Sequence, residues 1–289
     1  MADRSAIQWT DATWNPVTGC TPIASGCKYC YAKEMHRRLR AIGSAKYQHD
    51  FSEVRCHQED LDKPLRWRKS RRIFVNSMSD TFHKEVPFRF IADLFHVMCG
   101  EADAIGWHCR HTYQILTKRP DRMRQFFDWL SHREDEKEAD IAALAVRYHF
   151  DPPKNIWLGV SASTQDDLDR NVPDLLATPA AVRFLSLEPL LEQVDLRAIG
   201  TEVDAAGDAV PLDSLTGMYG DGPWKQRAHL GWVIVGAESG PHRRYYRDEW
   251  LDGIVEQCHV AGVPVYVKQI HRDGKVVKMP AEYPQEYPK

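Results

Sequence analysis

Three of the chain's seven cysteines, Cys20, Cys27 and Cys30, lie within the short stretch TGCTPIASGCKYCYA. Thiolates are soft ligands that suit zinc and iron–sulfur clusters. A disulfide or a C-x-x-C redox pair would be the other uses of such thiols. The total of seven is odd, and the N-terminus has no apolar signal segment, which predicts a reducing cytoplasm. The disulfide is therefore disfavoured, and a redox pair of Cys27 and Cys30 would leave Cys20 unused.

A metal centre remains, and its identity depends on the number of ligands. Structural zinc prefers four closed ligands. Only three thiols are close in sequence here, and candidates for a fourth ligand are scattered along the chain: Cys56, His36 and His57. A [4Fe–4S] cluster held by three cysteines leaves one iron open to an exchangeable ligand. The spacing favours a cluster over zinc and leaves zinc as an alternative.

The residues beside the cysteines fit this interpretation. Gly19 and Gly26 each precede a cysteine, and glycine tolerates the unusual backbone angles needed to wrap around an inorganic core. The sequence YAKEMHRRLRAI predicts a helix directly after Cys30. Backbone N–H groups and the dipole at a helix N-terminus favour a thiolate or an anionic cluster.

Seven short segments are predicted to be strands that carry these residues. Six are apolar runs rich in Val, Ile, Phe, Tyr or Leu, and the seventh precedes Cys20; the runs are 72–80, 112–120, 155–163, 182–189, 231–240 and 263–269. Their nearly continuous hydrophobicity is typical of parallel strands covered on both faces. Amphipathic segments between them predict helices, with Asp121 capping one and Gly262 ending another. The alternation predicts an α/β fold.

Polar residues follow the predicted strands where each one ends. The carboxyl ends of parallel strands share one edge, so a site assembled from many strand ends is typical of a barrel. We therefore expect a single domain over residues 1–289 with a partial or full (β/α) TIM-like barrel of parallel strands, although a doubly wound sheet stays open. Residues 191–230 lack clear periodicity and predict a loop insertion that covers the rim.

The triple cysteine, the aromatic Tyr29 before its last member and the following helix resemble the radical SAM superfamily. More closely, WNPVTGC, GCKYCYA, FVNSMSD, LTKRP, SLEPLL and VIVGAESGP together resemble a phage- and bacterium-associated family of uncharacterised radical-SAM-like proteins with a three-cysteine motif. The resemblance covers most of the chain outside roughly residues 190–230. It implies that Cys20, Cys27 and Cys30 bind a [4Fe–4S] cluster and that S-adenosylmethionine binds the open iron. The first cysteine gap is six residues rather than the usual three.

The superfamily also implies roles for the strand ends. No Gly-Gly-Glu follows the second strand, so acceptors for the methionyl amino group are expected from Asn76, Ser77 and Asp80. The remaining expectations are Lys118 and Arg119 for the methionyl carboxylate, Ser161 and Glu188 for the ribose, and Glu238 and Lys268 as catalytic residues. Each has a structural alternative: Asp80 is equally suited to capping a helix, and Lys268 to lying on the surface.

These patterns predict a cytoplasmic iron–sulfur enzyme that cleaves S-adenosylmethionine with an external electron donor. The net charge of −3 gives no global basic field, and the chain has no 18-residue apolar run that would span a membrane. RWRKSRR (66–72) and HRRYYR (242–247) mix cations with aromatics, so a nucleotide or nucleic acid is a candidate substrate. The alternatives are a non-radical iron–sulfur or zinc protein of phage origin that binds nucleic acid, and a zinc-dependent hydrolase.

Overall fold

The structure is a computed structural model that describes residues 5–100, 102–103, 106–107, 110–133, 139–203, 209–219 and 228–288. The chain separates into two compact units. Unit 1 comprises residues 1–23, 30–158 and 178–181, and unit 2 comprises residues 24–29, 159–177 and 182–289. The division falls inside one strand, β8 (Ile156–Ala162), between Leu158 and Gly159. The single domain that we expected from the sequence stays a prediction.

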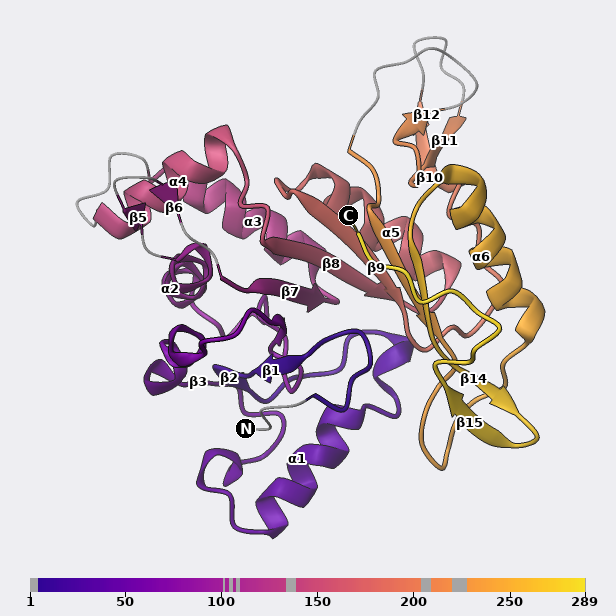
Figure 1. The fold of residues 1–289 in the computed structure, drawn as a ribbon, viewed down its shortest axis with the longest axis horizontal. Helices are drawn as coiled ribbons and strands as arrows, with labels where there is room; N and C mark the ends of the chain where they lie inside the picture. The colour runs from indigo at the N-terminus through magenta and orange to yellow at the C-terminus, as the bar shows by residue number, and fades with distance from the viewer. Residues whose placement is uncertain are drawn as a thin grey trace. The chain divides into compact units, whose positions relative to one another are not determined.

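Unit 1 is built on parallel strands: β1 (Ala12–Trp14), β4 (Arg72–Val75), β7 (Thr112–Thr117) and the start of β8. Figure 1 labels β1, β7 and β8. In register, Ala12 pairs with Ile73, and Ile73 pairs with Tyr113. Nearly all side chains of β1, β4 and β7 are buried or half-buried. Two further pairs of short strands are antiparallel: β2 (Val17–Thr18) with β3 (Arg55–Cys56), and β5 (Ala102–Asp103) with β6 (Gly106–Trp107).

The described residues of unit 1 include four α-helices: α1 (Tyr31–Ala41), α2 (Phe88–Cys99), α3 (Pro120–Ser131) and α4 (Ala139–Phe150). The last three pack on one another through an aromatic core in which Phe95 contacts Phe126, Phe127 and Tyr148. Arg119, not Asp121, is the N-cap residue of α3, because Pro120 already occupies the first helical position. The expected capping role of Asp121 is therefore wrong.

Unit 2 contains the end of β8 and three more parallel strands: β9 (Val182–Leu187), β13 (Trp232–Gly236) and β14 (Val265–Arg272). An antiparallel strand, β15 (Lys275–Lys278), completes the order β8-β9-β13-β14-β15. All five side-chain positions of β13 are buried, which agrees with its continuous run of apolar residues. Gly159 on β8 has the ring of Phe184 over it, 2.5 Å from where a Cβ atom would lie.

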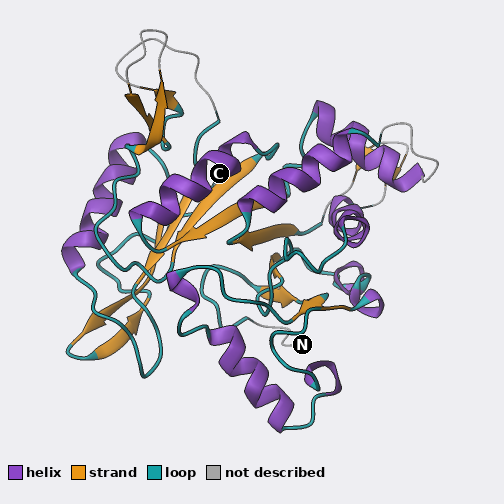
Figure 2. Ribbon diagram, turned by 180° about the vertical axis from the view of Figure 1, so that it is seen from behind, coloured by secondary structure: helices purple, strands orange, loops and turns teal. Residues whose placement is uncertain are grey.

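Two helices, α5 (Gln165–Ala177) and α6 (Asp248–Ala261), belong to unit 2. α6 ends at Gly262 in the left-handed conformation, as its sequence predicts. The predicted loop insertion carries a small antiparallel sheet of β10 (Ile199–Val203), β11 (Ala209–Asp213) and β12 (Met218–Tyr219). Residues 204–208 and 220–227 of that insertion lie outside the described residues. Figure 2 shows helices and strands in purple and orange.

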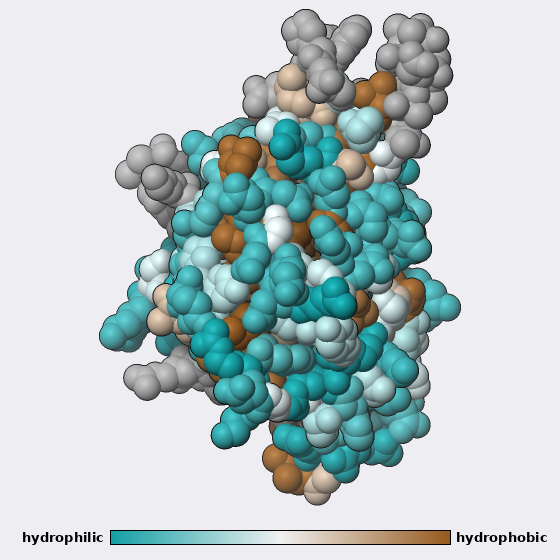
Figure 3. Space-filling view, turned by 90° about the vertical axis from the view of Figure 1, so that its right-hand side faces the viewer, coloured by the Kyte–Doolittle hydropathy of each residue, from teal (hydrophilic) through white to brown (hydrophobic). Residues whose placement is uncertain are grey.

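The expected α/β class with mostly parallel strands is confirmed, and closure into a TIM-like barrel stays a prediction. Apolar side chains lie mainly inside: the face drawn in Figure 3 is largely hydrophilic, with hydrophobic residues in small scattered groups. Among the described residues, none of the helices has the length and apolar character needed to cross a membrane.

Candidate functional site

The strand ends of unit 1 meet at one edge, as the sequence predicts. Asn15, which follows β1, accepts hydrogen bonds at Oδ1 from the Ser77 hydroxyl and the Met78 N–H, each at 3.1 Å. Asn76, which follows β4, has a φ of 57° and accepts a bond from the Val17 N–H at 2.9 Å. Its amide nitrogen donates to Thr81 at 2.8 Å. Asn76 therefore holds the loop after β4 in place.

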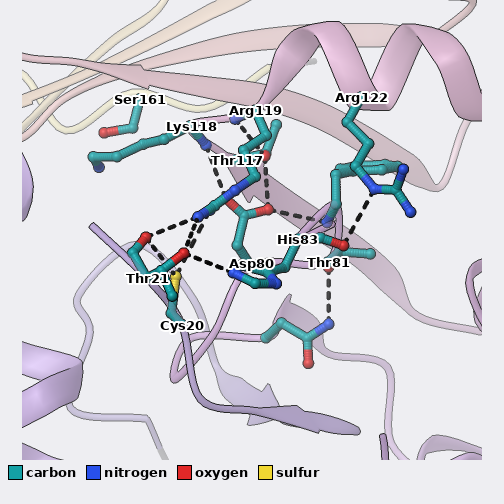
Figure 4. Close-up of polar contacts among 12 residues, drawn as sticks. Cys20, Thr21, Asp80, Thr81, His83, Thr117, Lys118, Arg119, Arg122 and Ser161 are labelled. Atoms are coloured by element: carbon teal, nitrogen blue, oxygen red, sulfur yellow. Dashed lines mark hydrogen bonds and ion pairs between the residues drawn. The ribbon is translucent and has the colours of Figure 1, made fainter. Parts of the chain in front are cut away.

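The buried carboxylate of Asp80 organises this edge. Its Oδ1 accepts hydrogen bonds from the Thr117 hydroxyl at 2.7 Å and the Phe82 N–H at 3.0 Å. Its Oδ2 accepts from Arg119 Nη1 at 2.9 Å and from the Lys118 N–H at 3.2 Å. Both oxygens are therefore engaged by the ends of β4 and β7 (Figure 4).

Arg119 connects this carboxylate to the first cysteine (Figure 4). Its Nη1 donates to Cys20 Sγ at 3.7 Å, and its Nη2 donates to the Thr21 carbonyl at 2.8 Å and the Thr21 hydroxyl at 3.2 Å. Burial alone would lower the pKa of Arg119, but the charges of Asp80 and Cys20 outweigh burial and raise that pKa. A fixed positive charge beside a sulfur favours its thiolate form, which is the form that binds metals.

His83 extends the same network. Its Nε2 is 2.8 Å from the Thr21 hydroxyl, and its Nδ1 accepts the Glu85 N–H at 3.2 Å. Burial and, next in size, the charge of Arg119 lower the pKa of His83. A neutral imidazole is therefore favoured beside Arg119 at neutral pH.

The backbone fixes Cys20 tightly. The Cys20 N–H donates to the Phe51 carbonyl at 2.7 Å. Gly19 has a φ of +86°, and a Cβ atom there would lie 2.0 Å from the Glu53 carbonyl oxygen. Only glycine fits this close approach, so the residue before Cys20 is determined by packing as well as by backbone angle.

Cys30 is the N-cap residue of α1, as the sequence predicts, and its side chain makes no capping hydrogen bond. It packs beside a small apolar cluster of Ala32, Tyr47 and Met78. Next in the chain, the Tyr31 hydroxyl donates to the Ser77 carbonyl. The N-terminus of α1 is thereby attached to the loop that follows β4.

Cys27 belongs to unit 2 with the rest of residues 24–29. Arg244 holds this segment: its Nη1 donates to the Ser25 carbonyl at 3.0 Å, and its guanidinium lies 5.5 Å from the centre of the Tyr29 ring. Glu238 in turn binds Arg244 through both carboxylate oxygens, at 2.6 and 2.9 Å. Burial would raise the pKa of Glu238, but its bonds to Arg244 lower it below the ordinary value.

A second ion pair in unit 2 joins the residue after β9 to the middle of β14. Lys268 Nζ is 2.7 Å from Glu188 Oε1, and the two side chains are 21% and 14% exposed. Gly236 leaves space there, because a Cβ atom at that position would lie 3.3 Å from the same carboxylate oxygen. Gln269 donates to the Ala237 carbonyl at 2.6 Å. The ends of β9 and β13 thus lie beside the middle of β14, which extends three residues past Gln269.

The candidate residues thus form two groups, each inside its own unit. Asn76, Ser77, Asp80, Lys118 and Arg119 meet in unit 1. In unit 2, Glu188 and Glu238 follow the ends of β9 and β13. Lys268 was expected to end its strand, but it lies inside β14, which continues to Arg272. Ser161 is buried on β8, and its backbone carbonyl accepts a bond from Asn171 at 3.2 Å. The expected contacts of all these residues with S-adenosylmethionine stay predictions.

Sequence reasoning missed three contributors: Thr21, His83 and Arg244 as the partner of Glu238. Thr21 and His83 lie in loops, and no periodicity marks them. In the sequence, Arg244 belongs to the basic run HRRYYR, which predicts a nucleic-acid contact rather than an ion pair. Its partner six residues earlier was a detectable signal, since a buried Glu needs a nearby cation.

The three proposed metal ligands are free cysteines of intermediate exposure, so their chemistry suits a thiolate-bound group. Cys20 and Cys30 belong to unit 1 and Cys27 to unit 2. Over the described part of the chain, no three His, Cys, Asp or Glu side chains are grouped as metal ligands. The thiol donors suit a cluster, while its geometry stays a prediction. Gly19 packs against the Glu53 backbone, so its role in wrapping around a cluster also stays a prediction.

Comparison with known proteins gives a family. No curated protein and no solved structure matches the chain. Residues 4–282 match the sequence model of a family described as "Protein of unknown function (DUF5131)". The match covers almost the whole chain, so this protein belongs to the DUF5131 family.

Proposed function

We propose that this protein is a radical-SAM-like iron–sulfur enzyme on a partial (β/α) barrel. The observation that carries the proposal is the contact between buried Arg119 and Cys20 Sγ, with Asp80 fixing the guanidinium. A guanidinium beside a thiol stabilises its thiolate form, which is the form that binds metals. The motif resemblance and the three free cysteines support the same function.

Cys20, Cys27 and Cys30 would hold a [4Fe–4S] cluster and leave one iron open for S-adenosylmethionine. When bound and reduced by an external donor, such a cluster would supply one electron for cleavage of the C5′–S bond of S-adenosylmethionine to methionine and a 5′-deoxyadenosyl radical. The chain itself positions the ligands: Arg119 orients Cys20, the N-terminus of α1 favours negative charge at Cys30, and Arg244 fixes the Cys27 segment.

In this proposal Asp80 and Arg119 act mainly on the cysteine. Their charged groups bind each other, Cys20 and Thr21, so Arg119 is a positioning residue. Lys118 remains the candidate for the methionyl carboxylate of S-adenosylmethionine, and Ser161 and Glu188 for its ribose hydroxyls. Lys268, which is paired with Glu188, remains the candidate catalytic residue. Glu238 acts through Arg244 on the Cys27 segment rather than on the reacting atoms.

The test begins with metal analysis of anaerobically purified and reconstituted protein. We expect iron and sulfide in the wild type, and their loss in Cys20→Ala, Cys27→Ala and Cys30→Ala. Cys56→Ala is the matched control, since Cys56 is a free and exposed cysteine of the same chain. Stoichiometric zinc in place of iron would refute the cluster.

The second step adds dithionite and S-adenosylmethionine and measures 5′-deoxyadenosine and methionine by mass spectrometry. We expect both products from wild type and Cys56→Ala. An intact cluster without cleavage would refute the radical reaction and leave a non-radical iron–sulfur protein.

A further inference from the structure

Two tyrosines of unit 2 are exposed. Tyr29 lies in the Cys27 segment, and Tyr245 lies in the loop after β13, next in sequence to Arg244, which bonds to that segment. Tyr29 is 40% exposed and Tyr245 is 70% exposed. Aromatic side chains usually bury their rings, and each of these rings is instead accompanied by cations. The pattern is that of a binding surface with flat apolar faces and positive charges side by side.

Around Tyr29 the charges come from two segments. Lys28 Nζ lies 5.3 Å from the ring centre and the Arg244 guanidinium lies 5.5 Å from it. The His242 ring is 5.8 Å away and inclined by 30° to the tyrosine. Since Arg244 also bonds to the Ser25 carbonyl, residues 24–29 and the loop after β13 form one built surface.

Tyr245 has its own partners. Arg247 lies over its ring at 5.7 Å and donates from Nε to its hydroxyl at 3.1 Å. Trp250, at the start of α6, stands at 88° to the ring with the centres 6.1 Å apart. The ring is thereby held in place while most of its surface stays accessible.

The cations of this surface are only partly neutralised. Arg244 is paired with Glu238, whereas Lys28, Arg243 and Arg247 form no ion pair with a carboxylate of the described residues. Arg243 instead donates to the Gly240 and Gly274 carbonyls, which orients it without cancelling its charge. Asp248 and Glu249 begin α6 and limit the positive charge on the side of Arg247.

We propose that this aromatic–basic surface, formed by Lys28, Tyr29, His242, Arg243, Tyr245 and Arg247, binds single-stranded nucleic acid. Unpaired bases would stack on the two tyrosines and phosphates would bind the cations. A nucleic-acid duplex keeps its base faces inside the helix, and an acidic protein has no bases to stack on the tyrosines. Two separate aromatic platforms, each with its own cation, favour a polynucleotide over one nucleotide.

Tyr29 lies two positions after Cys27 in the sequence. A nucleic-acid strand bound on this surface would therefore pass beside the proposed cluster ligand. The assignment of the bound nucleic acid as the substrate of the enzyme rests on the proposed function. The binding itself rests only on the contacts of unit 2, and it needs no metal.

The test is fluorescence anisotropy with labelled oligonucleotides of about 20 nucleotides, longer than one binding platform needs. Single-stranded DNA, single-stranded RNA and a DNA duplex are compared, using full-length protein both reconstituted and metal-free. We expect tighter binding of the single strands than of the duplex, with affinity that falls as salt rises. Comparing the affinities for single-stranded DNA and single-stranded RNA identifies which of the two is preferred.

Variants then test the two parts of the surface. Tyr29→Ala and Tyr245→Ala are expected to weaken binding roughly five- to hundredfold each, the loss typical of one stacked base, while Tyr29→Phe and Tyr245→Phe keep most of the affinity. The triple change Lys28→Gln, Arg243→Gln and Arg247→Gln should lower the salt slope by about 2. Arg197→Gln, an exposed arginine of unit 2 elsewhere, is the charge control.

Equal affinity of the Tyr→Ala variants and the wild type, tighter binding of the duplex, or full competition by a mononucleotide would overturn the inference. Circular dichroism of each variant separates lost binding from lost folding. Iron content and S-adenosylmethionine cleavage are measured on the same preparations. Binding that persists without iron supports the surface even if the cluster proposal fails, and a cluster without binding refutes the surface alone.

Discussion

Arg119 donates a hydrogen bond to the sulfur of Cys20 from 99 residues further along the chain. The same guanidinium nitrogen is bound by Asp80 at 2.9 Å. The strand-end loop after β7 therefore controls the charge beside the first cysteine, and Asp80 controls the position of that charge.

Removing the negative charge of Asp80 should lower the free energy of unfolding. Asp80→Asn leaves the buried Arg119 without a counter-charge, since the two side chains are only 8% and 10% exposed. We expect a loss of about 3 kcal/mol in the free energy of unfolding, measured by urea denaturation. Asp62→Asn breaks an exposed pair with Arg66 and should cost less than about 1 kcal/mol. Equal losses in the two variants would contradict the buried pair.

Arg119→Gln should make Cys20 less reactive in metal-free protein. Without the guanidinium a smaller fraction of the thiol is ionised, so alkylation by iodoacetamide at neutral pH should slow roughly threefold or more. Peptide mass spectrometry measures Cys20 separately from the other cysteines.

Arg122→Gln is the control for this change, because Arg122 donates to the carbonyls of His83 and Val86 instead. In Arg122→Gln, Cys20 should be alkylated by iodoacetamide at the wild-type rate. An unchanged rate in Arg119→Gln, across the whole pH profile, would show that the guanidinium does not act on the sulfur.

The pair of Glu238 and Arg244 predicts a pH dependence of stability. The folded pKa of Glu238 lies below its ordinary value of 4.5, so the pair contributes fully above pH 4.5. That contribution is lost as the pH falls from there through the folded pKa, because the unfolded chain then binds more protons. The free energy of unfolding of wild type should thus approach that of Glu238→Gln on acidification. Parallel pH profiles of the two proteins would disprove this linkage.

Gly19→Ala should destabilise the protein by more than the left-handed backbone angle of Gly19 alone accounts for. The new Cβ would lie 2.0 Å from the Glu53 carbonyl oxygen, so the loop has to move. Gly43→Ala is the matched control, with a φ of +77° and no atom within 4 Å of the new Cβ.

For Gly43→Ala we expect a loss of about 1 kcal/mol from the left-handed angle. Gly19→Ala should lose more, as measured by urea denaturation, and should retain less iron after reconstitution. If both variants lost the same stability and bound the same iron, the close approach at Gly19 would have no consequence.

Local residue patterns predict most of the strands and helices. Continuous apolar runs predicted β4, β7, β8, β9, β13 and β14. The polar residues after these runs predicted the location of the candidate site residues. The position of Cys30 before α1 and the end of α6 at Gly262 followed from capping signals. These features are local because burial periodicity and backbone preferences act over a few residues.

Tertiary structure decided which polar groups meet. Arg119 was expected to bind a ligand carboxylate, yet strand order and register bring it to Asp80 and Cys20. Arg244 bonds to Ser25 across 219 residues, a contact that no local pattern encodes. The strands of the small sheet β10-β11-β12 went unrecognised because they are short and lack a clear period. Partners of this kind depend on long-range chain packing, so only the folded structure identifies them.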